Sequence, residues 1–237
     1  MAQHSRYTIF SVRFMRPTRI FPIILAAGGP GKLGYAKALA RFGDKTALEI
    51  AVENCAGLEP PIVVLGYGAA PVCKSNLKVA RFVLNRNWRR GQLTSLLAGL
   101  RRVPRGSAFL LYPVDQPLLT RKLVERLVKA FRARRPKQKI VMPRAGKRAG
   151  HPIVCDGGLR GELRAAQTAR EVVYRDQSRI RYVRVADDAI WSDFDSNAAY
   201  RRCLRQYRLR QNQREKPASR FHKDHSPESD AKNTIRV

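Results

Sequence analysis

The stretch Pro22-Ile-Ile-Leu-Ala-Ala-Gly-Gly-Pro-Gly-Lys-Leu-Gly-Tyr-Ala-Lys37 joins an apolar run to a loop rich in glycine and lysine. Residues 20–25 are apolar and short enough to form a buried strand. Glycines let the backbone that follows turn tightly and direct its N–H groups toward an anion; here they are Gly28, Gly29, Gly31 and Gly34. Lys32 and Lys37 add mobile positive charge beside those donors. The stretch therefore predicts a phosphate-binding loop at the end of a buried strand.

Two other phosphate-binding patterns fit this loop less well. A P-loop requires G-x-x-x-x-G-K-[ST], whereas Leu33 follows Lys32 here, so no hydroxyl is placed to hold magnesium. A dinucleotide fold would combine the G-x-G-x-x-G spacing with an acidic residue at the end of the second strand. The predicted second strand, Ile62-Val-Val-Leu-Gly66, lacks that residue, and Glu49 and Glu53 fall in a predicted helix. A dinucleotide site and a glycine-rich turn without a ligand stay open as alternatives.

Strands and helices alternate through the middle of the chain. Apolar runs predict buried strands at 20–26, 62–66, 81–84, 108–112 and 139–142, and helical patterns fall at 46–56, 91–103 and 120–134. This alternation predicts a single α/β domain, Rossmann-like, with a mostly parallel twisted sheet and helices on both faces. Ligands bind such sheets beyond the carboxyl ends of the strands. The loop after Leu25 and the turn at Asp115 should therefore share one edge of the sheet.

Five motifs, in order along residues 20–205, resemble one family. They are Leu25 to Lys37 for L-A-[AG]-G-x-[GS]-x-R-[ML]-G-x-x-K, Asn87 to Leu100 for N-x-x-W-x-x-G-x-x-x-S-L-x-x-G-L, Pro113-Val-Asp-Gln-Pro117 for D-[QM]-P, Gly150-His-Pro152 for G-H-P, and Asp193-Phe-Asp-Ser196 for D-[IV]-[DN]-[ST]. The chain thus resembles the MobA-like nucleotidyltransferases. Its Ala-Ala-Gly, Asp-Gln-Pro and Gly-His-Pro segments most resemble the molybdenum cofactor cytidylyltransferases within that family.

The resemblance implies a sheet fold like that of the nucleotide-diphospho-sugar transferases and assigns roles to matching positions. The implied nucleotide-binding residues are Leu25, Ala26, Ala27, Gly28, Gly29, Gly31, Gly34, Lys37 and Ser95. Lys32 and the loop amides would hold the β- and γ-phosphates, while Lys37 would lie nearer the α-phosphate or the acceptor. Lys32, Lys37 and Asp115 are the expected catalytic residues. Gln116 and His151 are the expected substrate-binding residues.

Acidic residues near two of the motifs predict a magnesium site. Asp115 follows the run Ala108-Phe-Leu-Leu-Tyr112, so a rigid strand should carry its carboxylate to the ligand-binding edge. Mg²⁺ usually takes one or two protein carboxylates and completes its shell with water and phosphate oxygens. By resemblance Asp195 is the second ligand and Asp193 the less favoured one. On a strand these two side chains would point to opposite faces, and turn or capping chemistry is the alternative for both.

Some positions depart from the family pattern or stay open. Lys32 stands where the family usually has arginine, which keeps the charge but loses the planar fork that grips phosphate. The usual acidic segment after the last motif is replaced by Asn197-Ala-Ala-Tyr200. Thr94 and Ser95 could contact substrate or cap the helix that follows Gly91. These changes fit either retuned substrate binding or a protein that binds nucleotide without catalysis, and the retained lysines and aspartates favour activity.

Nucleotidyl transfer needs no covalent enzyme nucleophile, so the protein mainly aligns two anions and neutralises developing charge. By resemblance, Ala27 favours CTP as the donor. The combined motifs, by the same resemblance, imply a molybdopterin-bound molybdenum as the acceptor. A molybdenum hydroxylase or its maturation factor is the expected protein partner. A sugar phosphate, an isoprenoid precursor or a phosphorylated hydroxy acid remain alternative acceptors.

Composition limits the class of protein further. The net charge is +29, and basic residues are spread along the whole chain, which should attract nucleotides and other anions. Aromatic residues make up only 8%, without a nucleic-acid-binding module, so no specific nucleic acid is expected. Scattered cysteines and no apolar stretch of about 20 residues predict a cytoplasmic protein without a membrane span. We expect a domain at 20–210, an N-terminal extension at 1–19 that is either disordered or a misassigned start, and a basic, disordered tail at 211–237.

Overall fold

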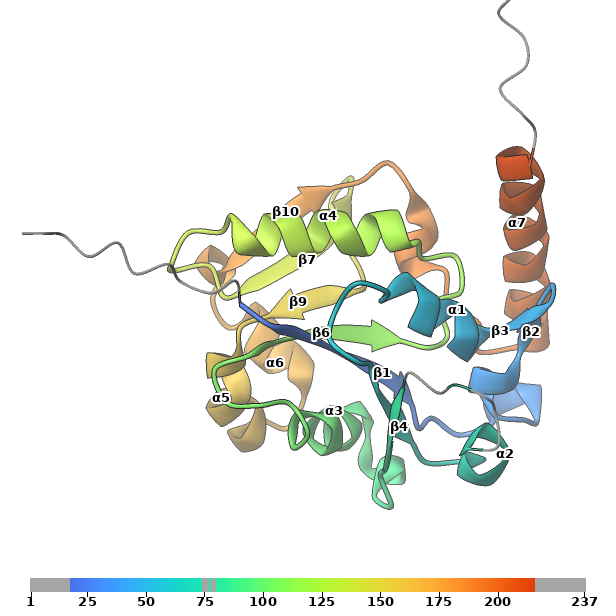
Figure 1. Cartoon of the computed structure of the whole chain (residues 1–237), viewed down its shortest axis with the longest axis horizontal. Coiled ribbons are helices and arrows are strands. Elements are labelled where there is room, and N and C mark those ends of the chain that lie inside the picture. Colours follow the sequence, from blue (N-terminus) through green and yellow to red (C-terminus); the bar gives the residue numbers. More distant parts are fainter. Residues whose placement is uncertain (1–17, 74–76, 78–79, 216–237) are drawn as a thin grey trace, which may run out of the picture.

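The computed structural model describes residues 18–73, 77 and 80–215 of the chain (Figure 1). Most of the predicted extension 1–19 and residues 216–237 of the predicted tail lie outside this part. Among the described residues, eight strands form one sheet with the order β10-β7-β9-β6-β1-β4-β5, and β8 pairs with β7. The strands are β1 (Ile20–Ala26), β4 (Ile62–Leu65), β5 (Arg81–Leu84), β6 (Ala108–Pro113), β7 (Ile140–Ala145), β8 (Arg148–Ala149), β9 (Ile153–Cys155) and β10 (Ile180–Arg184). The five strands predicted from apolar runs are all present.

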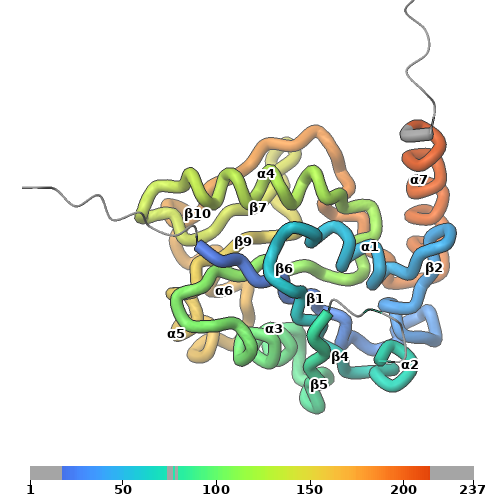
Figure 2. The backbone as a smooth tube through the Cα atoms, in the orientation of Figure 1, coloured from blue at the N-terminus to red at the C-terminus, as the bar shows by residue number. Residues whose placement is uncertain are grey.

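The central strand β1 is buried along its whole length and pairs in parallel with β4 and β6. The sheet is mostly parallel, as predicted, with β9 antiparallel to both of its neighbours, β6 and β7, as the arrows in Figure 1 show. Figure 2 traces β9 between these two strands. Because β9 runs the opposite way, its amino end lies at the same edge as the carboxyl ends of β6 and β7. This edge carries the motifs described below.

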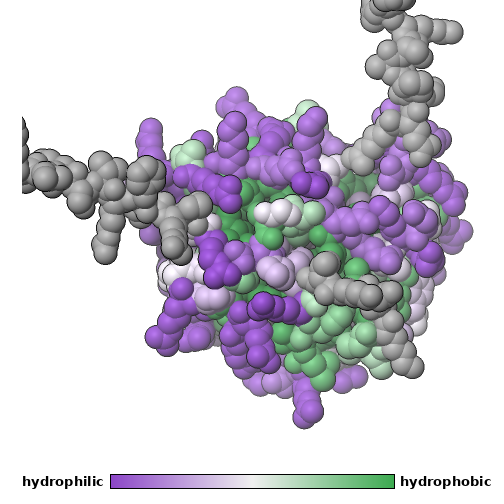
Figure 3. Space-filling model, viewed as in Figure 1, coloured by the Kyte–Doolittle hydropathy of each residue, from purple (hydrophilic) through white to green (hydrophobic). Residues whose placement is uncertain are grey.

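Helices cover both faces of the sheet, as the alternation predicts (Figure 1). On one face α1 (Ala47–Asn54) and α4 (Arg121–Arg132) pack in one hydrophobic cluster, and on the other α3 (Gln92–Leu100), α5 (Arg160–Ala165) and α6 (Ala169–Tyr174) pack in a second. A further short helix, α2 (Ala69–Cys73), follows β4. The predicted cap of α4 is confirmed, since the Thr120 hydroxyl accepts the Leu123 N–H at 3.2 Å. Hydrophilic side chains cover most of the face in Figure 3, around a smaller hydrophobic area.

The C-terminal helix α7 (Asn197–Glu215) continues beyond Arg210, so the helix extends five residues into the predicted tail. This helix packs against a small hairpin formed by β2 (Arg41–Phe42) and β3 (Lys45–Thr46). The Phe42 ring, which is fully buried, lies 5.3 Å from the Tyr200 ring and 5.6 Å from the Tyr207 ring, between ring centroids. Aromatic packing therefore holds a helix whose polar composition gives little sign of order.

Candidate active site

The glycine-rich loop leaves β1 at the sheet edge and closes one side of a cavity of about 200 Å³. Residues from three separate parts of the sequence line this cavity: Leu25, Ala26, Ala27, Gly28, Lys37, Trp88, Gln92, Ser95, Pro113, Val114 and Asp115. Seven of the residues predicted from the motifs are among them. Gly34 has φ +78°, a left-handed conformation that favours glycine, at the end of a short 3₁₀ turn. The structure thus brings the loop and the Asp115 turn together, as the topology predicts.

Lys37 is the charged centre of the site. Its ammonium donates to Asp115 Oδ2 at 3.0 Å and also to Asp195 Oδ1. The side chains of Lys37 and Asp115 are only 16% and 24% exposed, whereas that of Asp195 is 72% exposed. Burial lowers the pKa of Lys37, but the two carboxylates outweigh it and raise the pKa above its ordinary value. Lys37 is therefore a fixed cation between two acids that lie 80 positions apart.

Asp193 and Asp195 lie in an irregular loop before α7 and not on a strand, so the expected separation onto opposite faces does not apply. Burial raises the pKa of Asp193, and the neighbouring charges of Asp115 and Asp195 raise it further. Three carboxylates therefore share one region with a single bridging lysine. Asp193, the less favoured metal ligand in the sequence analysis, therefore also lies near Asp115, Asp195 and Lys37.

The two carboxylates that converge on Lys37 fit a magnesium ion. The Lys37 ammonium shows that Asp115 and Asp195 can hold one cation between them. Within the described ranges no cluster of three or more histidine, cysteine or acidic side chains is arranged to hold a metal. A site with two carboxylates suits Mg²⁺, which fills its remaining positions with water and phosphate oxygens, and does not suit a closed zinc site.

The two hydroxyl residues near the start of α3 have different surroundings. Buried Asn85 donates its amide hydrogens to Thr94 Oγ1 and Ser95 Oγ, each at 2.9 Å. The Thr94 hydroxyl donates to the backbone carbonyls of Asn87 and Gly91, and neither hydroxyl caps the helix. Ser95 lines the cavity with its oxygen already accepting from Asn85, so its own hydrogen is left to donate. This arrangement favours a ligand contact for Ser95 and a structural role for Thr94.

Trp88 forms a wall of the cavity that the sequence analysis did not single out. A Cβ added to Gly29 would lie 3.1 Å from Trp88 Cζ3, and one added to Gly66 would lie 2.7 Å from Trp88 Cγ. The Arg89 guanidinium stacks 4.6 Å from the centroid of the Trp88 ring. Asn85, Trp88 and Gln92 were all missed as site residues. The signal was present, because the N-x-x-W pattern aligns with Asn85 and Trp88 and begins two residues before Asn87.

The remaining predicted residues lie around the cavity and not in its lining. Gln116 follows β6 and is 6% exposed. His151 precedes β9, where burial lowers the pKa of the imidazole and the Asp115 charge partly offsets this. Lys32 is exposed in the 3₁₀ turn formed by residues 31–33, and a Cβ added to Gly31 would lie 3.5 Å from the Asp195 carbonyl oxygen.

Glu49 and Glu53, the acids considered for a dinucleotide site, are engaged elsewhere. Glu49 accepts the Thr46 N–H at 2.6 Å in a capping box at the start of α1. Glu53 pairs with Lys45 at 2.7 Å. Neither carboxylate is left to hold a ribose.

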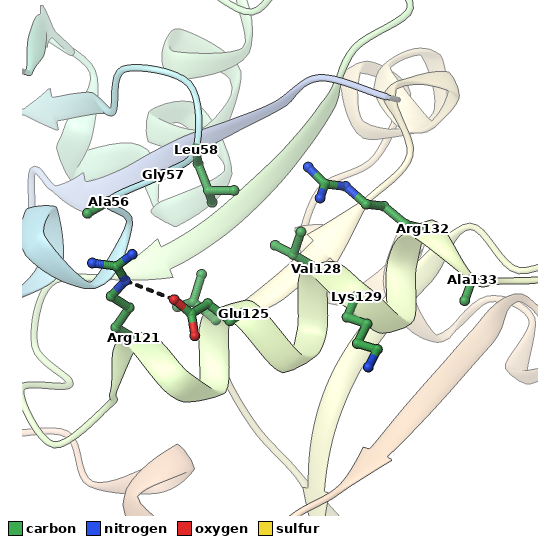
Figure 4. Close-up of a pocket in the computed structure, with 10 residues that line it drawn as sticks. Ala56, Gly57, Leu58, Arg121, Glu125, Val128, Lys129, Arg132 and Ala133 are labelled. Atoms are coloured by element: carbon green, nitrogen blue, oxygen red, sulfur yellow. Dashed lines mark hydrogen bonds and ion pairs between the residues drawn. The ribbon is translucent and has the colours of Figure 1, made fainter. Parts of the chain in front are cut away.

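A second cavity, of about 720 Å³, lies between α4 and the turn at Ala56, Gly57 and Leu58 (Figure 4). That turn precedes β4, so the groove lies toward the edge of the sheet opposite the motifs. Arg121 and Glu125 form an ion pair within it, and none of the predicted site residues lines it. Cavity volume is therefore a poor guide to the candidate site in this protein, because the smaller cavity contains the predicted residues.

Comparison with known proteins agrees with the geometry. Residues 22–182 match the MobA-like NTP transferase domain, so the chain belongs to the MobA-like nucleotidyltransferase family. Nicotine blue oxidoreductase of Paenarthrobacter nicotinovorans is 36% identical over 146 residues, which cover 58% of this chain and 71% of that protein. In the part of the chain that the structure describes, no helix is long and apolar enough to cross a bilayer.

Solved structures give the same fold. Rv0371c from Mycobacterium tuberculosis H37Rv superposes with a TM-score of 0.70 at 28% identity, covering 81% of this chain and 100% of that one. The same protein in complex with manganese gives a TM-score of 0.67 at 27% identity, covering 80% of this chain and 100% of that one. A CMP:2-keto-3-deoxy-manno-octonic acid synthetase complexed with CTP gives a TM-score of 0.66 at 13% identity, covering 83% of this chain and 100% of that one, which is a likeness of fold alone.

Proposed function

We propose that this protein is a cytoplasmic, magnesium-dependent cytidylyltransferase that transfers CMP from CTP to a molybdopterin-bound molybdenum and releases pyrophosphate. The observation that carries the proposal is the Lys37 ammonium held between Asp115 and Asp195 at the mouth of a cavity lined by the Ala26-Ala27-Gly28 backbone. Membership of the MobA-like family supports the reaction class. Ala27 supports CTP, and the Asp-Gln-Pro and Gly-His-Pro segments support the acceptor, by resemblance.

The proposed reaction is a single displacement. An oxygen of the acceptor's terminal phosphate attacks the α-phosphorus of CTP, a new P–O bond forms, and the bond from the α-phosphorus to the bridging oxygen breaks. Pyrophosphate leaves with the electron pair of that bond, and no enzyme nucleophile is needed. A bound Mg²⁺ would neutralise phosphate charge. Asp115 and Asp195 would hold it, and Mn²⁺ is a reasonable substitute because a structurally similar protein was solved with manganese.

The chain's own groups supply alignment and charge. Asp115 and Asp195 would hold the cation, and the Lys37 ammonium beside them would be available to phosphate oxygens. Ser95 donates toward the nucleoside, held in place by Asn85. The loop amides and Lys32 face the outer phosphates. Such pre-oriented donors lower the barrier because they need no reorganisation during the reaction.

The test is pyrophosphate release by the purified chain with Mg²⁺ and molybdenum-loaded molybdopterin, comparing CTP, GTP, ATP and UTP. We expect release with CTP alone. Asp115→Asn should slow it by roughly a thousandfold, whereas the matched control Asp156→Asn, at a carboxylate paired with Arg134 away from the cavity, should turn over normally. Equal activity of the Asp115 variant and wild type would overturn the mechanism.

The name of the Paenarthrobacter relative favours a second candidate, an oxidoreductase. The structure offers little for a nicotinamide dinucleotide, because Glu49 and Glu53 are engaged in a cap and an ion pair. Mixing the protein with NADH or NADPH and nicotine blue, and following absorbance of the reduced nicotinamide, separates the two. Steady oxidation without pyrophosphate release would replace the transferase proposal.

A further inference from the structure

Buried polar atoms without partners mark a second part of the site. In the part of the chain that the structure describes, four buried side-chain atoms have no hydrogen-bond partner: Gln116 Oε1, Arg144 Nε, His151 Nδ1 and Arg160 Nε. The Arg160 guanidinium is already held within the fold, because its two Nη atoms donate to the backbone carbonyls of Leu100 and Val103. A buried polar atom without a partner destabilises the fold, so the other three need an explanation.

These three atoms belong to neighbouring strand ends at one edge of the sheet. Gln116 follows the carboxyl end of β6, His151 precedes the amino end of β9, and Arg144 lies near the carboxyl end of β7. Because β9 is antiparallel to both neighbours, all three ends point the same way. Adjacent strands lie about 4.8 Å apart, so the row extends roughly 10 Å from the strand that carries Asp115. A ligand lying along this edge would meet all three residues.

Arg144 closes the far end of the row. Its guanidinium carbon lies 4.4 Å from the centroid of the Tyr182 ring, on the neighbouring strand β10. The residue is half-buried and forms no ion pair with any other described residue. A guanidinium that stacks on a ring keeps its N–H groups directed outward in one plane. Arg144 is thus a donor without a hydrogen-bond acceptor for its Nε among the residues that the structure describes.

Arg144 projects on the same face of the sheet as the cavity that Ser95 and Trp88 line. Met142, two residues earlier on β7, packs in the cluster on the α3 face, so Arg144 projects on that face as well. Ser95 on α3 and Trp88 lie on this face too. Arg148, in contrast, pairs across the hairpin with Ala145 and therefore projects on the opposite face. Its guanidinium also stacks on an aromatic ring, that of Trp191, at 4.9 Å.

We propose that Arg144, supported by Tyr182, is the distal anchor of the acceptor site and selects an acceptor with a planar heterocycle about 10 Å from its reacting phosphate. This rests on the proposed function, which places the reacting phosphate beside Asp115. Gln116 Oε1 accepts from the heterocycle and Arg144 donates to it, so the acceptor needs both donors and acceptors of hydrogen bonds on one ring system. A pterin has that chemistry, whereas a short sugar phosphate presents no planar ring to Arg144.

The test uses 6-hydroxymethylpterin phosphate, whose own fluorescence reports binding, with the full chain and three variants. We expect Arg144→Gln to weaken probe binding by roughly 10- to 100-fold, since a charge-assisted hydrogen bond is lost. Arg144→Lys should fall between wild type and Arg144→Gln, because it keeps the charge but not the plane. Arg148→Gln is the matched control and should bind the probe as wild type does. Affinity for CTP with Mn²⁺, measured by calorimetry, should not change in any of them.

The outcomes distinguish a failure of the proposed acceptor site from a failure of the proposed reaction. In turnover with molybdenum-loaded molybdopterin, Arg144→Gln should raise KM for the acceptor more than it lowers kcat. Equal losses in the Arg144 and Arg148 variants, or no probe binding by wild type, would overturn the inference even if pyrophosphate is released. Arg144-dependent probe binding by a wild type that releases no pyrophosphate would support the acceptor site while rejecting the proposed reaction.

Discussion

Replacing Lys37 by glutamine removes the cation that the structure places between Asp115 and Asp195. The ion pair from Lys37 Nζ to Asp115 Oδ2 is 3.0 Å long, and both side chains are mostly buried. Breaking a fully buried pair costs about 3–5 kcal/mol and an exposed pair is worth about 0.2–1 kcal/mol. This mostly but not fully buried pair falls between them, so Lys37→Gln should lose about 2 kcal/mol of unfolding free energy, or roughly 4–8 °C in Tm for a chain of this size.

The same substitution should improve metal binding in the absence of nucleotide. Without the ammonium the two carboxylates have no counterion, so Mn²⁺ should bind more tightly and should raise the Tm of Lys37→Gln more than that of wild type. Thermal unfolding with and without Mn²⁺, together with Mn²⁺ titration followed by electron paramagnetic resonance, measures both effects. Pyrophosphate release should fall at the same time, because the lysine no longer reaches the phosphates.

Lys45→Gln is the matched control, since Lys45 pairs with Glu53 at 2.7 Å but the two side chains are 38% and 55% exposed. It should cost less than about 1 kcal/mol and leave Mn²⁺ binding unchanged. The raised pKa of Lys37 keeps its contribution intact below the unfolded-state pKa, and that contribution is lost only as pH rises through the folded-state value. A Lys37 variant with the stability and Mn²⁺ response of the Lys45 variant would refute this account.

Three further substitutions test other parts of the structure. Asn85→Ala leaves two hydroxyls of α3 without their donor and should weaken CTP binding about tenfold, as measured by calorimetry; unchanged affinity would contradict the role assigned to Asn85. Gly66→Ala places a Cβ 2.6 Å from the Ala27 carbonyl oxygen and 2.7 Å from Trp88 Cγ, so the cavity lining must shift, and KM for CTP should rise more than KM for the acceptor in steady-state kinetics; equal changes would contradict it. Burial raises the pKa of Asp156, but hydrogen bonds from a backbone amide and Arg134 outweigh it and lower the pKa, so stability from this group is present above about pH 4 and is lost as pH falls through the folded-state value. Urea unfolding between pH 3 and 6 should therefore show a flatter acid limb for Asp156→Asn, and parallel curves would be inconsistent with this linkage.

The sequence predicts the centre of the sheet well and its far edge poorly. Strands such as β1 are buried on both faces and form continuous apolar runs, which need no knowledge of neighbours to recognise. By contrast, β9 has only three residues, and β10 reads Ile-Arg-Tyr-Val-Arg and is only partly buried at the sheet edge. Helix α7 has the same difficulty, because its order comes from packing on Phe42, a residue more than 150 positions away.

The site divides in the same way. Motif spacing predicts Lys37, Asp115 and Ser95, and these residues do line one cavity. The pairing of Lys37 with Asp195 depends on how a loop near the end of the domain folds back, which local sequence does not encode. The N-x-x-W pattern begins at Asn85, but spacing alone does not show that its amide positions two hydroxyls. Its function arises from burial, which only the fold supplies.

The charge of the site explains why a metal–nucleotide complex, and not free nucleotide, would be the species that fits the proposed reaction. The chain carries a net charge of +29, so its long-range field attracts anions. At the cavity, however, Asp115, Asp193 and Asp195 outnumber Lys37, the one cation that bridges two of them. A triphosphate that arrived alone would place its oxygens beside those carboxylates, whereas a divalent cation held by Asp115 and Asp195 would supply the missing positive charge. In the proposed reaction the positive field would therefore govern how fast substrates arrive, and the local acids would govern which form of the nucleotide binds.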